Sequence, residues 1–140
     1  MKIISKKYVD KLTYQIIGAA IEVHKSLGPG LLEKIYEVCL IKELNLRGLK
    51  TTSQKCIPIC YKGEVLDADI RYDILVEDCI VVELKAVLKM NSYFEVQALS
   101  YAKLLKIPKA ILINFACENI VNEGQKTFVT EIYRRLPRSA

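Results

Sequence analysis

Glycine and proline are scarce in this sequence, with only six glycines and four prolines in 140 residues. Hydrophobic residues make up 51% of the chain and charged residues 26%. This composition excludes disordered, collagenous and low-complexity chains. A chain of this length is expected to fold as one domain, which buries roughly 68% of the surface that the unfolded chain exposes. We therefore expect a single globular domain over residues 1–140.

No hydrophobic run is long enough to cross a membrane. The longest runs, such as 110–113 and 80–82, fall far short of the roughly 18 residues that a spanning helix needs. The first residues mix lysines with hydrophobic residues and show no export signal. These observations predict a cytoplasmic protein without a membrane partner.

Cysteine and histidine are too few, or wrongly spaced, for the common metal clusters. The five cysteines include no C-x-x-C pair, so neither a disulfide framework nor a structural zinc site is suggested. We expect reduced, mostly buried thiols. His24 is the only histidine, which excludes a histidine-based metal cluster. Its place beside an apolar helical stripe favours a structural role; the alternative is that it lies near Glu33 and helps to bind phosphate.

The spacing of hydrophobic residues predicts helices over 9–27, 31–46 and 91–106. Gly28-Pro29-Gly30 separates the first two helices. Segments rich in β-branched residues predict five strands, over 55–61, 65–76, 79–86, 110–117 and 127–134. The first three strands would form an antiparallel meander. The order ααβββαββ predicts an α/β (α+β) fold in which helices flank a central mixed sheet.

Two neighbouring strands of this prediction carry unusually polar faces. In the first, a period of two places Asp67, Asp69, Arg71 and Asp73 on one face. In the next strand, Glu83 and Lys85 share a face, while Val82, Leu84 and Ala86 share the other. A turn near Glu77-Asp78 joins the strands, so residues equidistant from it should pair. We therefore expect Asp73 to lie close to Glu83 and Lys85.

Two carboxylates at close range repel each other, which raises one pKa unless a cation neutralises them. Mg²⁺ suits this task because it prefers oxygen ligands, is held by one or two carboxylates and commonly assists phosphate chemistry. The adjacent lysine could orient or deprotonate water, or stabilise phosphate charge. The alternative is an exposed polar face whose cross-strand ion pairs contribute about 0.2 to 1 kcal/mol each.

Three further polar residues share helical stripes with hydrophobic ones. Gln97 and Tyr101 are four residues apart in the third predicted helix. A core-facing glutamine without a partner would cost roughly 1 to 3 kcal/mol, so Gln97 is expected to face a polar pocket beside the sheet. A side chain at the stripe edge that reaches water is the alternative. Glu33 lies on the same side of its helix as Tyr36 and Leu40, where a partly buried carboxylate would need a cation.

The segment Gly30-Leu31-Leu32-Glu33-Lys34-Ile35-Tyr36 matches the G-x-x-E-x-x-Y signature of the GxxExxY proteins, a branch of the PD-(D/E)XK nuclease superfamily. Asp73, Glu83-Leu84-Lys85 and Gln97-Ala98-Leu99-Ser100-Tyr101 resemble the aspartate, E-x-K and Q-x-x-x-Y motifs of that superfamily, in the same order. Four motifs in order are far more specific than one. The resemblance extends from about residue 16 to 129. One departure is that Tyr72, rather than proline, precedes the aspartate.

The resemblance implies a restriction-endonuclease-like core with a four-stranded mixed sheet. Asp73 and Glu83 would be metal ligands, and the carbonyl of Leu84 could add a third. Glu33 would lie beside them, and Lys85 would assist the attacking water or the phosphate. Gln97 and Tyr101 would support the pocket or touch the nucleic-acid backbone.

These implications predict a Mg²⁺-dependent nuclease, with Mn²⁺ as a substitute ion, that hydrolyses phosphodiester bonds of nucleic acid, DNA being favoured. The competing interpretation is a nucleic-acid-binding or protein-interaction module that keeps the nuclease fold with little catalysis. Its motivation is that a bare core of 140 residues leaves few residues to grip a long substrate.

The charge of the chain permits a nucleic-acid partner without requiring one. Lysine and arginine number 21 against 16 acidic residues, a net charge of +5. Basic residues crowd the C-terminus at Arg134, Arg135 and Arg138, and others are expected to flank the site: Lys85, Lys89, Lys103, Lys106 and Lys109. Such residues would attract phosphate in a salt-dependent way. An exposed last strand over 127–134 could also pair across a two-fold axis, which predicts a homodimer.

Overall fold

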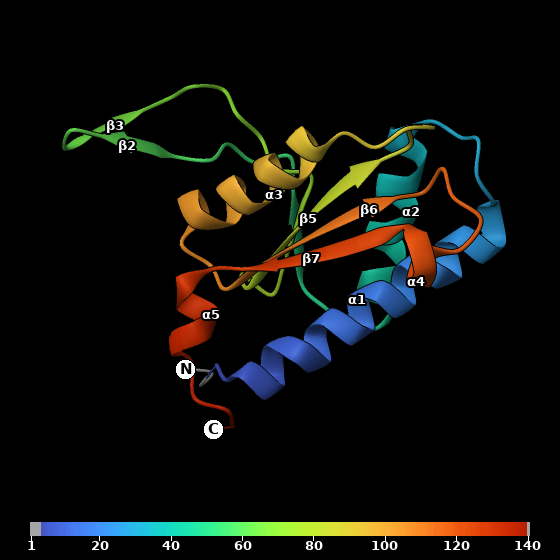
Figure 1. Ribbon diagram of the computed structural model, residues 1–140, viewed down its shortest axis with the longest axis horizontal. Helices are drawn as coiled ribbons and strands as arrows, with labels where there is room; N and C mark the ends of the chain where they lie inside the picture. The colour runs from blue at the N-terminus through green and yellow to red at the C-terminus, as the bar shows by residue number, and fades with distance from the viewer. Residues whose placement is uncertain (1–3, 140) are drawn as a thin grey trace.

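The computed structural model describes residues 4–139 (Figure 1). The helices are α1 (Lys6–Leu27), α2 (Glu33–Leu46), α3 (Ser92–Leu105), α4 (Ile120–Glu123) and α5 (Glu131–Arg135). The strands are β1 (Thr51–Ser53), β2 (Ile59–Tyr61), β3 (Glu64–Leu66), β4 (Ile74–Val76), β5 (Ile80–Lys85), β6 (Lys109–Asn114) and β7 (Gln125–Val129). Their order along the chain is therefore ααβββββαβαβα rather than the predicted ααβββαββ.

A five-stranded mixed sheet, in the order β1-β4-β5-β6-β7, forms the centre of the fold. Strands β5 and β6 are parallel, with a register that runs from Ile80 opposite Lys109 to Lys85 opposite Asn114. The other neighbouring strands are antiparallel. The predicted fold, a mixed sheet flanked by helices, is confirmed, although the sheet has one strand more than the four that the family resemblance implies.

Helices cover both faces of this sheet, α1 and α2 on one side and α3 on the other (Figure 1). The alternation of side chains along the strands divides the core accordingly. Ile80, Val82 and Leu84 of β5 pack with α1 and α2, whereas Val81 packs with Ala98 and Ala102 of α3. By the same alternation, Glu83 and Lys85 lie on the α3 side of the sheet.

The prediction of one long strand over 65–76 is wrong. The chain pairs as β3 and again as β4, but between them only Arg71 forms a β-bridge, with Cys56. Asp69 adopts a left-handed backbone conformation, with φ of 53°, and its N–H donates to Oδ1 of Asp67 over 2.9 Å. This local bond competes with strand pairing, as is usual for aspartate. Asp67, Asp69 and Arg71 therefore do not share a strand face with Asp73.

The predicted meander is also wrong. Strands β2 and β3 pair only with each other, in a two-stranded ribbon that projects from the body of the molecule (Figure 1). Strand β1, over 51–53, occupies the place beside β4 that the meander gave to 55–61. Prediction and structure agree better for β5, which lies within the predicted 79–86.

The last two predicted strands end earlier than expected. Strand β6 ends at Asn114 rather than at residue 117, and β7 ends at Val129. Thr130 precedes α5 and is tied to the start of β6, because its N–H donates to the carbonyl of Pro108 and its hydroxyl to that of Ile107. The edge strand available for the predicted homodimer is thus 125–129 and not 127–134.

The helix ends follow the expected chemistry. The side chain of Asn91 accepts a hydrogen bond from the N–H of Tyr93 and caps α3. Helix α3 ends at Lys106, in a left-handed conformation, before Pro108. Helix α2 starts at Glu33, two residues later than predicted. Among residues 4–139, no helix combines the length and the hydropathy that a membrane span requires.

The cysteines differ from the prediction in their burial. All five are free thiols, but only Cys79 is buried, while Cys56 and Cys60 are exposed on and beside the projecting ribbon. The expectation of mostly buried thiols is therefore wrong. It failed for Cys60 because that residue lies on the ribbon, whose side chains from residue 60 to 66 are exposed.

Candidate functional site

The predicted acidic residues converge at the C-terminal end of β5, on the side that faces α3. Ile74 of β4 lies opposite Val82 of β5, so Asp73, one residue earlier, reaches Glu83. The N–H of Asp73 donates to Oε2 of Glu83 over 2.8 Å, and the N–H of Leu84 donates to Oδ2 of Asp73 over 2.8 Å. The backbone at Asp73 therefore holds the carboxylate of Glu83, and the backbone of β5 holds the carboxylate of Asp73.

Burial makes the negative charge of this pair costly. It raises the pKa of Glu83 to about 8, and the neighbouring charge of Asp73 acts in the same direction. Burial likewise raises the pKa of Asp73, although its hydrogen bond from Leu84 opposes the shift. Without a cation, Glu83 therefore retains a proton near neutral pH.

Lys85 lies next to this pair without forming an ion pair with another described residue. Its ammonium nitrogen lies 4.4 Å from the centroid of the Phe94 ring of α3, a favourable cation–π distance. Its positive charge nevertheless lowers the pKa of Glu33, Asp73 and Glu83. The lysine is thus held beside the carboxylates while its ammonium remains available to a negatively charged ligand.

Glu33 approaches the same group from the first residue of α2. Desolvation is the main cause that raises the pKa of its carboxyl, Lys85 opposes it, and Asp73 adds to it. These interactions bring Glu33 into the electrostatic field of the strand residues. Glu33 as a whole residue is exposed to solvent, unlike the partly buried side chain that was expected. Only its carboxyl group is partly desolvated.

Tyr36 holds the turn that presents Glu33. Its buried ring stacks on Phe115, with ring centroids 4.4 Å apart and planes within 4°. Its hydroxyl donates to the carbonyl of Gly28 over 2.6 Å and accepts from the N–H of Leu31 over 3.1 Å. Gly30, with φ of 102°, allows the turn between them. The spacing G-x-x-E-x-x-Y thus has a physical basis: the glycine shapes the turn and the tyrosine fixes it.

Gln97 and Tyr101 are partners on α3. The side-chain amide of Gln97 donates to the hydroxyl oxygen of Tyr101 over 3.1 Å, so the glutamine has the partner that its position required. Burial raises the pKa of Tyr101, and the charges of Glu83 and Asp73 raise it further. The electrostatic coupling shows that this helix face lies over the strand carboxylates.

A family model described as the PD-(D/E)XK nuclease superfamily matches residues 10–128. The chain belongs to the PD-(D/E)XK nuclease superfamily. Nucleases of this superfamily typically use divalent metal ions, and membership implies nucleic-acid binding. No curated protein and no solved structure matches the chain. The narrower resemblance to the GxxExxY proteins stays a prediction.

The donor set of this nuclease-fold site suits a hard divalent ion. Among residues 4–139, no group of three histidine, cysteine or acidic side chains converges as a ready metal site. Two carboxylates do converge, and Mg²⁺ is commonly bound through one or two carboxylates while several waters remain on the ion. The raised pKa of Glu83 is the sign of a charge that a cation would stabilise. Leu84 has a hydrocarbon side chain, which is buried in the core, so only its main-chain carbonyl can serve as a metal ligand.

Two residues of this site were missed by the sequence reasoning. Glu37, only 5% exposed, follows one turn after Glu33 on α2. The amide of Gln54 donates to Oε1 of Glu37 over 2.7 Å and to Oδ1 of Asp73 over 3.2 Å. Glu37 could have been found, because residues four apart share a helix face. Gln54 carries no sequence signal: it follows β1 in a left-handed conformation and reaches Asp73 only through the fold.

Asn114 supports the segment that follows Lys85. In the parallel register it lies opposite Lys85. Its buried side chain accepts from the N–H of Val87 over 3.1 Å and donates to the carbonyl of the same residue over 2.9 Å. These bonds extend the contact between β5 and β6 beyond the last paired residue. Sequence reasoning missed this residue as well.

A groove of about 850 Å³ borders the site at this end of the sheet. It lies between the turn before α2 and the segment after β5, and its lining includes Leu31, Ala86, Leu88, Met90, Glu118 and Glu123. Leu88 is fully exposed beside it. Its lining mixes polar with apolar groups, has acidic charged residues, and contains none of Glu33, Asp73, Glu83 and Lys85.

Two predicted details of the surroundings are settled by contacts elsewhere. His24 places its Nε2 atom 2.7 Å from the carbonyl oxygen of Cys117, which supports the structural interpretation. The expectation that Lys109 flanks the site is wrong, because it pairs with the first residue of β5 while the site lies at the last. Because β6 runs parallel to β5, its first residue lies at the end of the sheet opposite the site.

Proposed function

We propose that this protein is a Mg²⁺-dependent nuclease that hydrolyses phosphodiester bonds of nucleic acid, with DNA as the favoured substrate and Mn²⁺ as a substitute ion. The observation that carries this proposal is the reciprocal hydrogen bonding of Asp73 and Glu83, which fixes two desolvated carboxylates beside the ammonium group of Lys85, and that ammonium forms no salt bridge within residues 4–139.

Asp73 and Glu83 are the proposed metal ligands, with the carbonyl of Leu84 as a further donor. A bound Mg²⁺ would polarise the phosphoryl group and lower the pKa of a bound water. For this role both carboxylates must be ionised, so metal binding has to displace the proton that the buried pair holds. Gln54 and the two backbone N–H groups fix the orientation of the carboxylates before the ion arrives.

Lys85 and Glu33 are the proposed catalytic residues next to the ligands. The ammonium of Lys85 orients the attacking water or stabilises the negative charge that develops on the phosphate. Water attacks phosphorus, the bond from phosphorus to the leaving oxygen breaks, and that oxygen takes up a proton. Glu33 would orient water at the edge of the site, while Gln97 and Tyr101 would support the pocket or contact the nucleic-acid backbone.

A second candidate function is a nucleic-acid-binding module that retains the nuclease fold with little catalysis. It is favoured by one observation: a core of 140 residues leaves few residues to grip a long substrate, so tight or selective cleavage would need a further partner.

Isosteric variants distinguish the two candidates. Asp73→Asn, Glu83→Gln and Lys85→Met keep most of the shape of each side chain, and the two amides keep oxygen atoms that accept the backbone hydrogen bonds. On labelled DNA and RNA substrates with Mg²⁺, the nuclease predicts a loss of cleavage on the order of 100-fold or more in each variant. Glu22→Gln, on the exposed face of α1, is the matched control and should cleave as the wild type does.

Cleavage that persists in a folded Glu83→Gln variant would contradict the assigned role. Binding of nucleic acid by the wild type without cleavage, on single- and double-stranded substrates and with either ion, would support the second candidate instead.

A further inference from the structure

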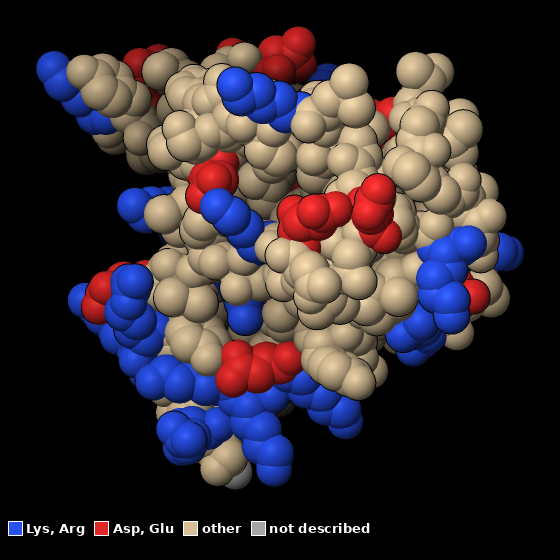
Figure 2. Space-filling view, turned by 45° about the vertical axis from the view of Figure 1, so that its right-hand side comes forward, with Lys and Arg blue, Asp and Glu red and all other residues tan. Residues whose placement is uncertain are grey.

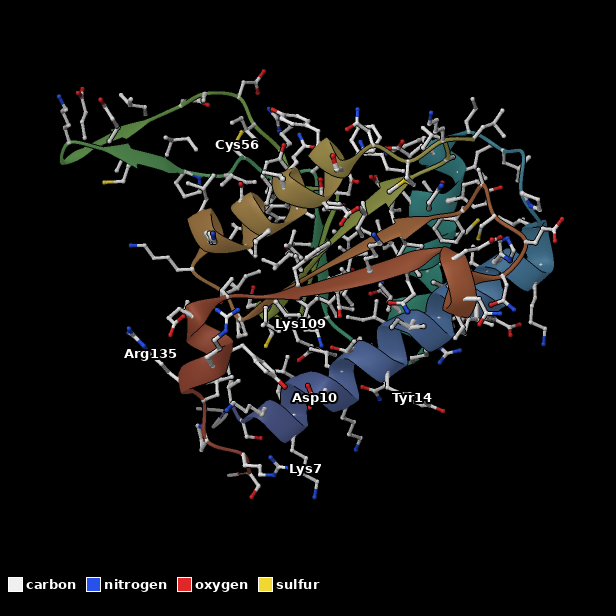
Figure 3. The ribbon with its side chains drawn as sticks, viewed as in Figure 1. Lys7, Asp10, Tyr14, Cys56, Lys109 and Arg135 are labelled. Carbon is white, nitrogen blue, oxygen red and sulfur yellow. The ribbon has the colours of Figure 1, made fainter. Side chains whose placement is uncertain are left out.

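Much of the net positive charge of this chain lies at the end of the sheet away from the site. We call this surface the basic end and define it by eight residues: Lys6, Lys7, Asp10, Lys109, Glu131, Arg134, Arg135 and Arg138. Six cations and two acids give a charge of 6 − 2 = +4, against 21 − 16 = +5 for the whole chain. The remaining residues are therefore nearly neutral. Figure 3 shows Lys7, Asp10, Lys109 and Arg135 at this end, and Figure 2 shows basic side chains gathered there.

The backbone holds these cations together. The N–H of Lys6 donates to the carbonyl of Pro137 over 2.8 Å, and the N–H of Lys7 donates to that of Arg138 over 3.0 Å. The C-terminal segment thus caps the first turn of α1 and brings Arg138 beside the two lysines. This turn carries no acidic residue. Lysines there oppose the helix dipole, which favours negative charge at a helix N-terminus.

The centre of the basic end is a buried lysine. Lys109 is only 8% exposed, and its ammonium lies 5.8 Å from the centroid of the Tyr133 ring and 4.0 Å from Oδ1 of Asp10. Lys6 lies 5.9 Å from the centroid of the same ring. The hydroxyl of Tyr133 donates to the same oxygen of Asp10 over 2.8 Å. The carboxylate of Asp10 is therefore shared by Lys109 and Tyr133, and the cluster keeps an excess of positive charge.

The arrangement suits an extended polyanion better than a single phosphate. The first N–H groups of α1 are occupied by the C-terminal carbonyls and by the side chain of Ser5, so they form no cradle for one anion. Three of the cations, Lys6, Lys7 and Arg138, instead line an open groove of about 440 Å³ together with Asp10 and Tyr133. Separate side chains of this kind can each meet a different phosphate of a nucleic-acid backbone.

The basic end and the site are at opposite ends of one pair of parallel strands. Lys109 pairs with Ile80, and Asn114 pairs with Lys85, five residues further on. At about 3.3 Å per residue this separates the two places by roughly 16 Å along the strands. They also lie on opposite faces of the sheet, because Lys109 meets Asp10 of α1 whereas Glu83 and Lys85 face α3, so a bound nucleic acid has to pass around the edge of the sheet to reach both. We propose that the basic end binds backbone phosphates of the nucleic-acid substrate outside the bond that is cleaved. This inference rests on the proposed function for the identity of the polyanion.

The test compares two triple variants that lose the same charge. Lys7→Gln/Arg135→Gln/Arg138→Gln removes three exposed cations of the basic end. Lys25→Gln/Lys42→Gln/Lys50→Gln removes three exposed lysines elsewhere. Binding to a 30-base-pair DNA duplex and to a single strand of the same length is measured by fluorescence anisotropy between 50 and 300 mM salt. EDTA is present throughout, so that binding is read without cleavage.

Each phosphate contact contributes about 0.9 to the slope of log K against log salt for duplex DNA. The basic-end variant is expected to lower that slope by about 2 to 3 and to weaken binding at 50 mM salt by more than tenfold. The control variant is expected to change the slope by less than 1. The single variant Arg135→Gln should lower it by about 0.9, which keeps the test valid if the triple variant does not fold.

Equal slopes in the two triple variants would overturn the proposal. The proposal would also be overturned if the basic-end variant bound both nucleic acids as the wild type does but bound vesicles with 30% phosphatidylserine more weakly. The partner would then be a lipid surface. Mg²⁺ titration and hydrolysis of bis(p-nitrophenyl) phosphate, which is too small to reach both places, test the catalytic site separately. If the wild type neither bound Mg²⁺ nor hydrolysed this compound, the proposed nuclease activity would be rejected. The salt dependence of nucleic-acid binding would still decide the role of the basic end.

Discussion

Asp73 and Glu83 hold each other in place through the backbone: the N–H of Asp73 binds the carboxylate of Glu83, and the N–H of Leu84 binds the carboxylate of Asp73. Two acidic residues are thereby kept together although burial and mutual repulsion disfavour their charges. This arrangement holds the oxygen donors of two carboxylates at a fixed place. Its properties lead to testable predictions about stability, metal affinity and cleavage.

The stability of the metal-free protein should fall as the pH rises. The pKa of Glu83 is raised from 4.5 to about 8, so the folded state holds a proton that the unfolded state releases. The stabilising effect is present below pH 4.5 and is lost as the pH rises toward 8. Urea unfolding at pH 5, 7 and 9 in EDTA should show this decline in the wild type and a much weaker one in Glu83→Gln. Equal pH dependence of the two proteins would contradict the coupling.

Tyr36→Phe should weaken both the fold and the site. The substitution keeps the stacking on Phe115 but removes the hydroxyl that binds Gly28 and Leu31. Loss of a buried hydrogen-bonding group costs about 1 to 3 kcal/mol in the free energy of unfolding. Cleavage should also decrease, because the turn that presents Glu33 loosens. Tyr14→Phe is the control: Tyr14 is 81% exposed, and its substitution should change neither urea midpoint nor cleavage.

Gln54→Ala should lower the affinity for Mg²⁺ by about tenfold, because residues that orient metal ligands typically contribute that much. The amide of Gln54 separates the carboxylates of Glu37 and Asp73, and the variant would leave them to repel each other. The double variant Gln54→Ala/Glu37→Gln should recover part of the affinity. Calorimetric titration checks both, with Gln125→Ala as the control. An unchanged dissociation constant in Gln54→Ala would show that Asp73 needs no such support.

Asn114→Ala should loosen the segment after Lys85 specifically. The side chain of Asn114 makes two hydrogen bonds with the backbone of Val87. Hydrogen exchange at the Val87 amide should accelerate at least tenfold, while amides at the centre of β6 keep their protection. The kcat for cleavage should fall more than KM rises, because Lys85 is less well positioned. If the Val87 amide exchanges as slowly as in the wild type, Asn114 does not restrain this segment.

The sequence allowed the prediction of residues whose placement depends on strand alternation and short connections. The E-x-K spacing puts Glu83 and Lys85 on one face, and the tight turn before β5 brings Asp73 to them. Gln97 was also expected to require a hydrogen-bonding partner, and its amide donates to the hydroxyl oxygen of Tyr101. These relationships span few residues, so periodicity was sufficient to find them.

Residues that depend on distant parts of the chain escaped prediction. Gln54 reaches Asp73 because of a left-handed residue conformation, and Asn114 meets Val87 only when β6 is parallel to β5. The long strand over 65–76 failed for the opposite reason: its β-branched residues favour a strand, but a local turn at Asp67 and Asp69 interrupts it. The basic end unites residues from both ends of the chain, which no periodicity reveals.

The central claim is that Asp73 and Glu83 bind a divalent metal ion, and calorimetric titration of Mg²⁺ and Mn²⁺ tests it most directly. Wild type, Asp73→Asn/Glu83→Gln and the control Glu22→Gln are compared at pH 7.5 after circular dichroism shows that all three are folded. The account predicts one binding event in the wild type and the control, accompanied by proton release, and none in the double variant. Equal binding by the double variant and the wild type would contradict it.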